Sequence, residues 1–226
     1  MANRIHILLP TIRPVDCAGQ IESVLGEQGI SPGRWTMHVC ANYSTVEGRA
    51  MLWRHVNATE YGVEIDDHDK ILPGSLARLE AAIDWAEDND LRAYLYAETW
   101  HNGRTNVGRS FTRGMWAKGL RAMRRDVYEE SGGLRPEDAP AESYATALRA
   151  EESGVNMIRV VGCVLHLNYS DGKMADKSSF SALEKKAREL CRASKKRRHR
   201  RKCKPCYDFD GNGLVPPKEQ ITQQTL

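Results

Sequence analysis

Short apolar runs with the composition of β-strands recur along the first 170 residues, and segments with helical periodicity separate them. Strands are predicted at residues 5–9, 35–41, 61–65, 91–97 and 155–167. Helices are predicted at residues 18–28 and 46–59, and a third one opens at Pro73-Gly74 and ends at Asp88. Strands that alternate with helices are typical of a mostly parallel sheet flanked by helices, so the predicted fold class is α/β.

Two later segments depart from this alternation. Residues 99–114 are rich in Gly, Asn, Thr and Arg and lack periodicity, which predicts a loop. We expect it to lie over or beside the candidate site at residues 66–69. A further helix is expected from about Ser178, where Ser181 and Glu184 have the spacing of a capping box. Its basic continuation is expected to leave the core.

The length of 226 residues allows one α/β domain, or a domain of about 170 residues with an appendage, which we favour. We divide the chain into a main α/β domain at 1–172, a linker with a basic helix at 173–204, and a tail at 205–226. No run approaches the ~18 apolar residues of a membrane span. The first apolar run is too short for a signal peptide, so a cytoplasmic protein is expected. Six scattered cysteines suit reduced thiols better than disulfides.

Charge is distributed unevenly. Residues 185–204 hold twelve of the 33 Lys and Arg residues and one acid, Glu189, so the other residues carry 21 basic against 29 acidic groups. The body is therefore acidic and the helix that follows it strongly basic. Two interpretations stay open, a solvated charged helix end and a surface that binds DNA or another polyanion. No aromatic residues interleave the basic run, so sequence-specific reading of bases by it is not expected.

An acidic cluster follows the strand at 61–65 directly. Asp66, Asp67, His68 and Asp69 are consecutive, and Pro73-Gly74 then opens a helix. Three carboxylates within four residues repel one another as anions, and a divalent cation is the simplest reason to place them together with an imidazole. The sequence therefore predicts a site for a metal and a diphosphate at the carboxyl end of this strand.

Four blocks of residues, in order, resemble the GT-A fold glycosyltransferases, especially family 2, over about residues 4–170. They are the opening strand with Pro10-Thr11, the acidic cluster with Pro73-Gly74, the Arg-Arg to Gly-Gly segment at 124–133, and Glu142-Ser143-Tyr144 with Arg149. The resemblance implies a nucleotide-sugar donor whose two phosphates are bridged by a divalent metal, Mn²⁺ or Mg²⁺. That metal stabilises the charge on the departing nucleoside diphosphate.

The resemblance leaves two registers open for the metal. Asp67-His68-Asp69 is a literal D-x-D, whereas alignment on Pro73 makes Asp66 and His68 a D-x-H pair. In relatives of the second kind a later histidine completes the site, and His166 has a suitable place; the alternative is a histidine hydrogen-bonded at a strand end. The candidate metal ligands are Asp66, Asp67, His68, Asp69 and His166.

Further donor contacts follow from the resemblance. Residues 41–44 lack the acidic pair that usually binds the nucleoside, so Asn42 or Ser44 is expected to substitute. Lys173 and Lys177 lie where related enzymes carry a loop over the diphosphate. The candidate residues for nucleotide-sugar binding are Thr11, Arg13, Asn42, Arg54, Asp66 and Asp67, and ordinary surface or capping roles are the alternative for Thr11, Arg13 and Arg54.

The acceptor side departs from the family at one position. The resemblance assigns Arg124, Arg125, Gly132 and Gly133 to this side. Ser143 stands where inverting members carry the aspartate that deprotonates the acceptor, and serine cannot take that proton at neutral pH. Four alternatives stay open: Glu142 is the base, Asp138 is the base, the enzyme is retaining, or catalysis is lost.

The last segment contains two metal-like patterns. Asp208, Asp210, Asn212, Leu214 (through its carbonyl) and Glu219 fit a calcium loop, although Pro216-Pro217 would stiffen it. Cys203 and Cys206 form half a zinc site that only Cys191 and His199 could complete. A polar, poorly ordered tail and free thiols are favoured over calcium and zinc.

The predicted function is metal-dependent transfer of a sugar from a nucleotide donor to a hydroxyl acceptor. A hydroxylated base in DNA suits the basic helix as acceptor, and protein or glycan acceptors are alternatives. From another class, the chain could be a lapsed GT-A relic that binds nucleic acid. A nucleotidyltransferase is disfavoured because its glycine-rich opening motif is missing.

Overall fold

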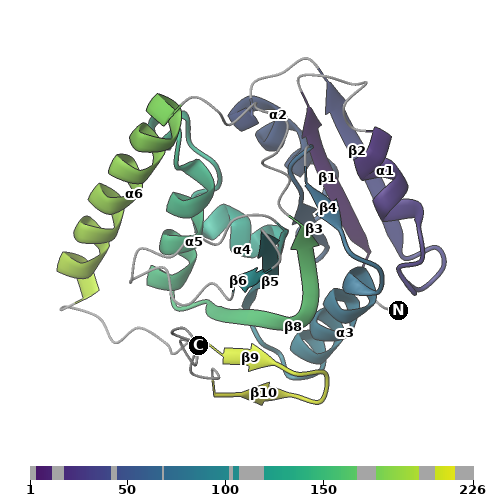
Figure 1. Ribbon diagram of the computed structural model, residues 1–226. Coiled ribbons are helices and arrows are strands. Elements are labelled where there is room, and N and C mark those ends of the chain that lie inside the picture. The colour runs from purple at the N-terminus through teal and green to yellow at the C-terminus, as the bar shows by residue number, and fades with distance from the viewer. Residues whose placement is uncertain are drawn as a thin grey trace, which may run out of the picture.

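The computed structural model describes residues 4–11, 18–41, 45–67, 69–101, 104–106, 120–166, 177–198 and 207–216. One mixed sheet runs through the molecule, and helices cover both of its faces (Figure 1). The strand order is β10-β9-β8-β5-β7-β3-β1-β2. The predicted α/β class is confirmed.

The strands near the site are mostly parallel. β1 (Ile5–Thr11) lies between β2 (Trp35–Ala41) and β3 (Tyr61–Glu64) and runs parallel to both. β5 (Ala93–His101) runs parallel to β8 (Asn156–His166). β7 (Arg121–Arg124) is antiparallel to β3 and β5, so the sheet is mixed rather than parallel throughout.

The helices divide between the two faces. The bounds are α1 (Ala18–Leu25), α2 (Thr45–Leu52), the 3-10 turn η2 (Trp53–His55), α3 (Ser75–Asp88), α4 (Arg125–Glu130), the 3-10 turn η4 (Pro136–Asp138), α5 (Glu142–Glu152) and α6 (Lys177–Arg198). Because side chains alternate along a strand, Ile7 belongs to a core cluster with residues of α1 and α3. Leu8 belongs to a second cluster with residues of α2, α4, α5 and α6.

Two predictions about local structure are wrong. Residues 99–101 continue β5, and β6 (Arg104–Asn106) pairs back onto them, so this part of the predicted loop is a hairpin. Trp100 and Thr105 face each other across it, and aromatic and β-branched residues favour strands. Residues 107–114 lie outside the described residues. Ser181 lies inside α6, which begins at Lys177, so it does not cap the helix.

The basic helix stays attached to the domain. α6 lies beside α5 (Figure 1), and its buried residues Ala187, Cys191 and Ser194 face the core. The prediction that the basic continuation leaves the core is therefore wrong for residues 185–194, because small residues at helical spacing let the helix pack closely.

The segment 207–216 belongs to the sheet. β9 (Tyr207–Phe209) runs parallel to β8, and β10 (Leu214–Val215) closes a hairpin on it. Phe209 is buried in the core, and the carboxylate of Asp208 forms a buried ion pair with Arg159 of β8. A poorly ordered tail is therefore wrong for these residues. The division of the chain at 172 and 204 as a whole stays a prediction.

The hairpin uses the carboxylates of the calcium pattern. Asp208 binds Arg159, and Asp210 accepts hydrogen bonds from the backbone N–H groups of Asn212 (2.9 Å) and Gly213 (3.3 Å). The apolar residues beside these carboxylates pair as strands, so the segment forms a hairpin instead of the helix-flanked loop of a calcium site. The described part of the pattern therefore gives no support for calcium, and Glu219 lies outside the described residues.

The zinc pattern is only partly within the structure. Cys203, Cys206 and His199 lie outside the described residues. Cys191 is buried in the core with Ala187 and residues of α5, which favours a structural role over a metal ligand. In the parts of the chain that the structure describes, no helix combines the length and the apolar character that a bilayer crossing requires.

Replacing Asp208 by Ala should lower the free energy of unfolding by about 3 kcal/mol, because the buried Arg159 would lose its close partner and, among the described residues, keep only the 4.0 Å contact to Glu98. Urea denaturation measures this change. The matched control is Asp210→Ala at the exposed hairpin tip, which should cost about 1 kcal/mol or less. Equal costs for the two variants would contradict the buried ion pair.

A stack of three histidines bridges β1, β2 and η2. His6 Nδ1 lies 2.8 Å from His38 Nε2, and the ring of His38 stacks on that of His55 with a centroid distance of 4.7 Å. His6 Nε2 lies 3.0 Å from the carboxylate of Glu60. Burial, followed by the neighbouring His6 and His55, lowers the pKa of His38.

This stack should make folding stability fall with acid. Since the pKa of His38 is lower in the folded state than its ordinary value of about 6.5, neutral His38 stabilises the fold above that pH. The stabilisation is lost as the pH falls from about 6.5 through the lowered pKa. Between about pH 7.5 and about pH 5.5, the free energy of unfolding measured with urea should fall less for His38→Gln than for the wild type. The same loss in both proteins would contradict this.

Candidate functional site

The candidate site lies where two neighbouring parallel strands end. Thr11 is the last residue of β1, and Asp66 and Asp67 follow the end of β3 after one residue, Ile65. The hydroxyl of Thr11 donates a hydrogen bond of 2.8 Å to Asp67 Oδ2. The structure thus brings together residues from the first two blocks, at the edge where open α/β sheets bind ligands.

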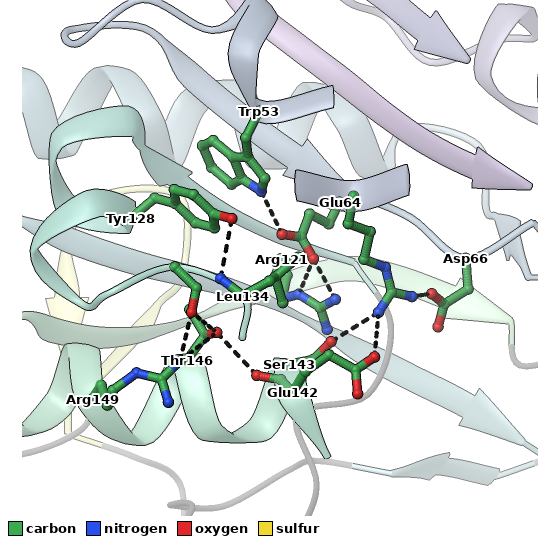
Figure 2. Close-up of polar contacts among 12 residues, drawn as sticks. Trp53, Glu64, Asp66, Arg121, Tyr128, Leu134, Glu142, Ser143, Thr146 and Arg149 are labelled. Carbon is green, nitrogen blue, oxygen red and sulfur yellow. Dashed lines mark hydrogen bonds and ion pairs between the residues drawn. The ribbon is translucent and has the colours of Figure 1, made fainter. Parts of the chain in front are cut away.

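A buried ion pair fixes the end of β3. Glu64 and Arg121 are direct cross-strand partners on β3 and β7, and Arg121 Nε donates to Glu64 Oε2 at 2.8 Å (Figure 2). The indole of Trp53 donates to Glu64 Oε1 at 2.6 Å. Burial by itself would raise the pKa of Glu64, but the charges of Arg121 and Arg49 and the bond from Trp53 outweigh it and lower the pKa.

Trp53 also requires a glycine beside it. Its ring lies over Gly62 of β3, where an added Cβ would come within 2.5 Å of the indole. Trp53 also stacks on Tyr128 with a centroid distance of 4.0 Å. The indole is therefore packed against both β3 and α4, where it can donate its hydrogen bond to Glu64.

Arg49 of α2 links the acidic cluster to α5. It is 5 % exposed, and its guanidinium forms an ion pair with Asp66. Nη1 also donates to Ser143 Oγ at 3.0 Å and lies 3.4 Å from Glu142 Oε1 (Figure 2). Burial lowers the pKa of Arg49, the charge of Arg121 adds to this, and the carboxylates of Glu64, Glu142 and Asp67 oppose it.

Sequence reasoning missed Arg49 and chose Arg54 from the same segment. Arg54 is exposed, whereas Arg49 shares the buried face with Leu52, Trp53 and Val56. That face has the i, i+3, i+4, i+7 spacing of an amphipathic helix, which was the signal that could have identified Arg49.

The two candidate base residues have different surroundings. Glu142 opens α5 and faces Arg49. Asp138 lies in η4 and forms an ion pair of 2.5 Å with Arg149. Arg149 in turn donates to the carbonyls of Ser131 and Gly133, so Asp138 belongs to a cluster that holds the turn after α4.

The acceptor-side block forms this turn. Gly132 and Gly133 have φ of 76° and 58°, a region that favours glycine, and Tyr128 leaves no room for a Cβ at Gly133. Arg124 pairs with Asp126, and Arg125 pairs with Glu129. In the structure both arginines therefore make local ion pairs.

The chain after the acidic cluster turns back toward β8. The N–H of Asp69 donates to the carbonyl of Asp66 at 3.3 Å, and the Asp69 side chain is buried. β4 (Lys70–Ile71) follows, and its Lys70 is the antiparallel partner of His166 at the end of β8. The backbone position of His166 is thus one residue along the ladder from Asp69, although its side chain is not described.

The candidate metal ligands Asp66, Asp67 and Asp69 offer hard carboxylate oxygens, which suit Mg²⁺ or Mn²⁺. His68 lies outside the described residues, as do Arg13, Asn42, Ser44 and Lys173. Within the described ranges, no three His, Cys, Asp or Glu side chains form a group that could hold a metal ion. The candidate ligands and donor contacts therefore stay predictions, with Thr11, Asp66 and Asp67 brought together at one strand end.

Comparison with known proteins supports the fold. No family model matches the sequence, and no curated protein matches it. The mannosyltransferase PcManGT from Pyrobaculum calidifontis, in complex with GDP-Man and Mn²⁺, has a similar structure with a TM-score of 0.57 and 12% identity, over 88% of this chain and 75% of that one.

Two more solved structures are similar. TarS of S. aureus (residues 1–349) has a TM-score of 0.51 at 12% identity, and GalNAc-T7 with UDP, GalNAc and Mn²⁺ has 0.53 at 10%. Each match covers 73% of this chain, which spans 58% of the TarS chain and 43% of the GalNAc-T7 chain. Sequence identity this low shows the fold alone, and that fold is the GT-A-like one that the motif order implied.

Proposed function

We propose that this protein is a metal-dependent glycosyltransferase that moves a sugar from a nucleotide-sugar donor to a hydroxyl group. The observation that carries the proposal is the pair Asp66 and Asp67 at the carboxyl end of β3, with Asp67 bonded to Thr11 of β1. Two of the similar structures, PcManGT and GalNAc-T7, are complexes with Mn²⁺, and the first of them contains GDP-Man.

The acidic cluster would hold the cation through Asp66, Asp67 and Asp69, with His68 and His166 as the nitrogen ligands. When bound, a divalent ion supplies charge stabilisation for the nucleoside diphosphate that leaves. Thr11 fixes Asp67, and the Glu64–Arg121 pair fixes the strand that presents both aspartates. Arg13, Asn42 and Arg54 are proposed to contact the donor.

The acceptor hydroxyl needs a base if the reaction inverts the sugar. We assign this role to Glu142, because it lies at the start of α5 in the group that Arg49 connects to Asp66. Asp138 is the weaker candidate because it lies in the Arg149 cluster that holds the turn after α4 and, within the described residues, has no contact with the group around Asp66. Ser143 accepts a hydrogen bond from Arg49 and, as a serine, does not serve as the base. If the reaction retains the configuration of the sugar, no separate base is needed.

Purified protein should release nucleoside diphosphate from at least one of a panel of UDP-, GDP- and dTDP-sugars when Mn²⁺ is present, and chelation should abolish the release. Asp66→Ala and His68→Ala should both reduce it to background, because each removes a proposed cation ligand. The matched control is Asp210→Ala, which removes an exposed carboxylate at the hairpin tip. Release that is indifferent to Mn²⁺ or to both site variants would contradict the proposal.

For the acceptor we propose a polyanion, with a hydroxylated base in DNA as the first candidate. Lys185, Arg188 and Arg192 are exposed along α6, opposite its buried face. The sequence continues with eight more Lys and Arg residues up to Lys204, and the rest of the chain is acidic. A phosphate backbone complements this distribution of charge. Protein and glycan acceptors are the alternatives.

Binding to duplex DNA should weaken steeply with salt, and the triple variant Lys185→Gln, Arg188→Gln, Arg192→Gln should reduce the log–log slope by about 2–3. Fluorescence anisotropy across a salt series measures the slope. A control with Arg78→Gln on α3 and Arg92→Gln just before β5 removes two arginines outside α6 and should leave the slope unchanged. Equal slopes for the triple variant and the wild type would exclude α6 as the contact.

The second candidate function is a lapsed relic that binds nucleic acid, which Ser143 at the base position favours. It predicts DNA binding through α6 without release of nucleoside diphosphate from any donor.

A further inference from the structure

Arg49 connects two parts of the proposed site that come from distant segments of the chain. Asp66 follows β3, and Glu142 and Ser143 open α5, yet all three contact one guanidinium (Figure 2). Asp66 is on the side of the proposed cation, and Glu142 is on the side of the proposed base.

The guanidinium depends on these partners for its charge balance. Arg49 is buried, and its Nε has no hydrogen-bond partner within the described residues. The nearby Glu64 is already bound by Arg121 and Trp53. A buried charge without compensation is strongly destabilising. The charges of Glu64 and Asp67 act on Arg49 from nearby, and Asp66 and Glu142 are the carboxylates that form ion pairs with it.

We propose that Arg49 is a positioning residue that competes with the divalent cation for Asp66 and thereby couples donor binding to the start of α5. This inference rests on the proposed function. A cation bound to Asp66 repels the guanidinium that shares the same carboxylate. Arg49 then turns to Glu142 and Ser143, and its contact to Glu142, now 3.4 Å, becomes its main ion pair.

The consequence is an order of binding. Cation and donor at Asp66 direct Arg49 onto Glu142, which fixes the first turn of α5 before the acceptor enters. Arginine suits this role because its planar fork can reach two carboxylates and a hydroxyl at once, whereas a lysine ammonium binds as a single point charge.

The test compares wild type, Arg49→Met and Arg49→Lys in two measurements that do not depend on turnover. In the first, Mn²⁺ affinity is measured by electron paramagnetic resonance in the presence of UDP or GDP. Arg49→Met should bind Mn²⁺ about fivefold tighter or more, because the competing charge is gone. A merely structural role predicts equal or weaker binding in a damaged site, and that result would overturn the inference.

In the second measurement, hydrogen exchange is followed at the amides of residues 142–146. Mn²⁺ with nucleoside diphosphate should slow this exchange in the wild type, and Arg49→Lys should lose the response while still binding Mn²⁺. The matched control is Arg34→Lys, since Arg34 also bridges two carboxylates, Glu80 and Asp84, but lies away from the site. A full response in Arg49→Lys would also overturn the inference, and this variant decides the question if Arg49→Met does not fold.

The outcomes separate this inference from the proposed function. If the wild type binds no Mn²⁺ with either diphosphate, both the inference about Arg49 and the proposed function are contradicted. Wild type that binds Mn²⁺ in an Asp66-dependent way, with unchanged behaviour of the Arg49 variants, leaves the glycosyltransferase proposal standing and removes the coupling alone.

Discussion

The buried ion pair between Glu64 and Arg121 is the constraint on which the site depends. It joins β3 to the antiparallel β7 in the middle of the sheet, and both charges are almost completely removed from solvent. Loss of either partner would leave an uncompensated buried charge, which is far more costly than an exposed one. Because the pair holds the last residue of β3, it sets where the chain emerges and therefore where Asp66 and Asp67 lie relative to Thr11.

Around this pair the site is a network of alternating charges. Arg121 neutralises Glu64, and Arg49 lies between Asp66 and Glu142, so the acidic cluster and the start of α5 share one electrostatic environment. In a low-dielectric setting such groups influence one another strongly. The glycosyltransferase proposal uses this arrangement directly, since a cation at the cluster changes the charge that α5 faces through Arg49.

Much of the fold and part of the site could be predicted from local patterns. The apolar run Ile5 to Leu9 predicted a strand, and the order of motifs grouped Thr11 with Asp67 as candidate donor contacts. The direction of β7 could not be predicted, because Arg121–Arg124 carries no local mark of antiparallel pairing. β9 was missed because Asp208 is stabilised by Arg159, 49 residues earlier, and a local pattern of acids resembled a calcium loop instead. Arg49 was missed because a local resemblance to the family, rather than burial, guided the choice of Arg54.

The most direct test of this account is to locate the cation. Crystals grown with Mn²⁺ and UDP or GDP would show by anomalous scattering where the metal binds. The account predicts one peak at the carboxyl end of β3, within coordination distance of Asp66 or Asp67 and of the two phosphates. A peak elsewhere, or an ordered diphosphate at that strand end without metal, would contradict a metal-dependent transferase site.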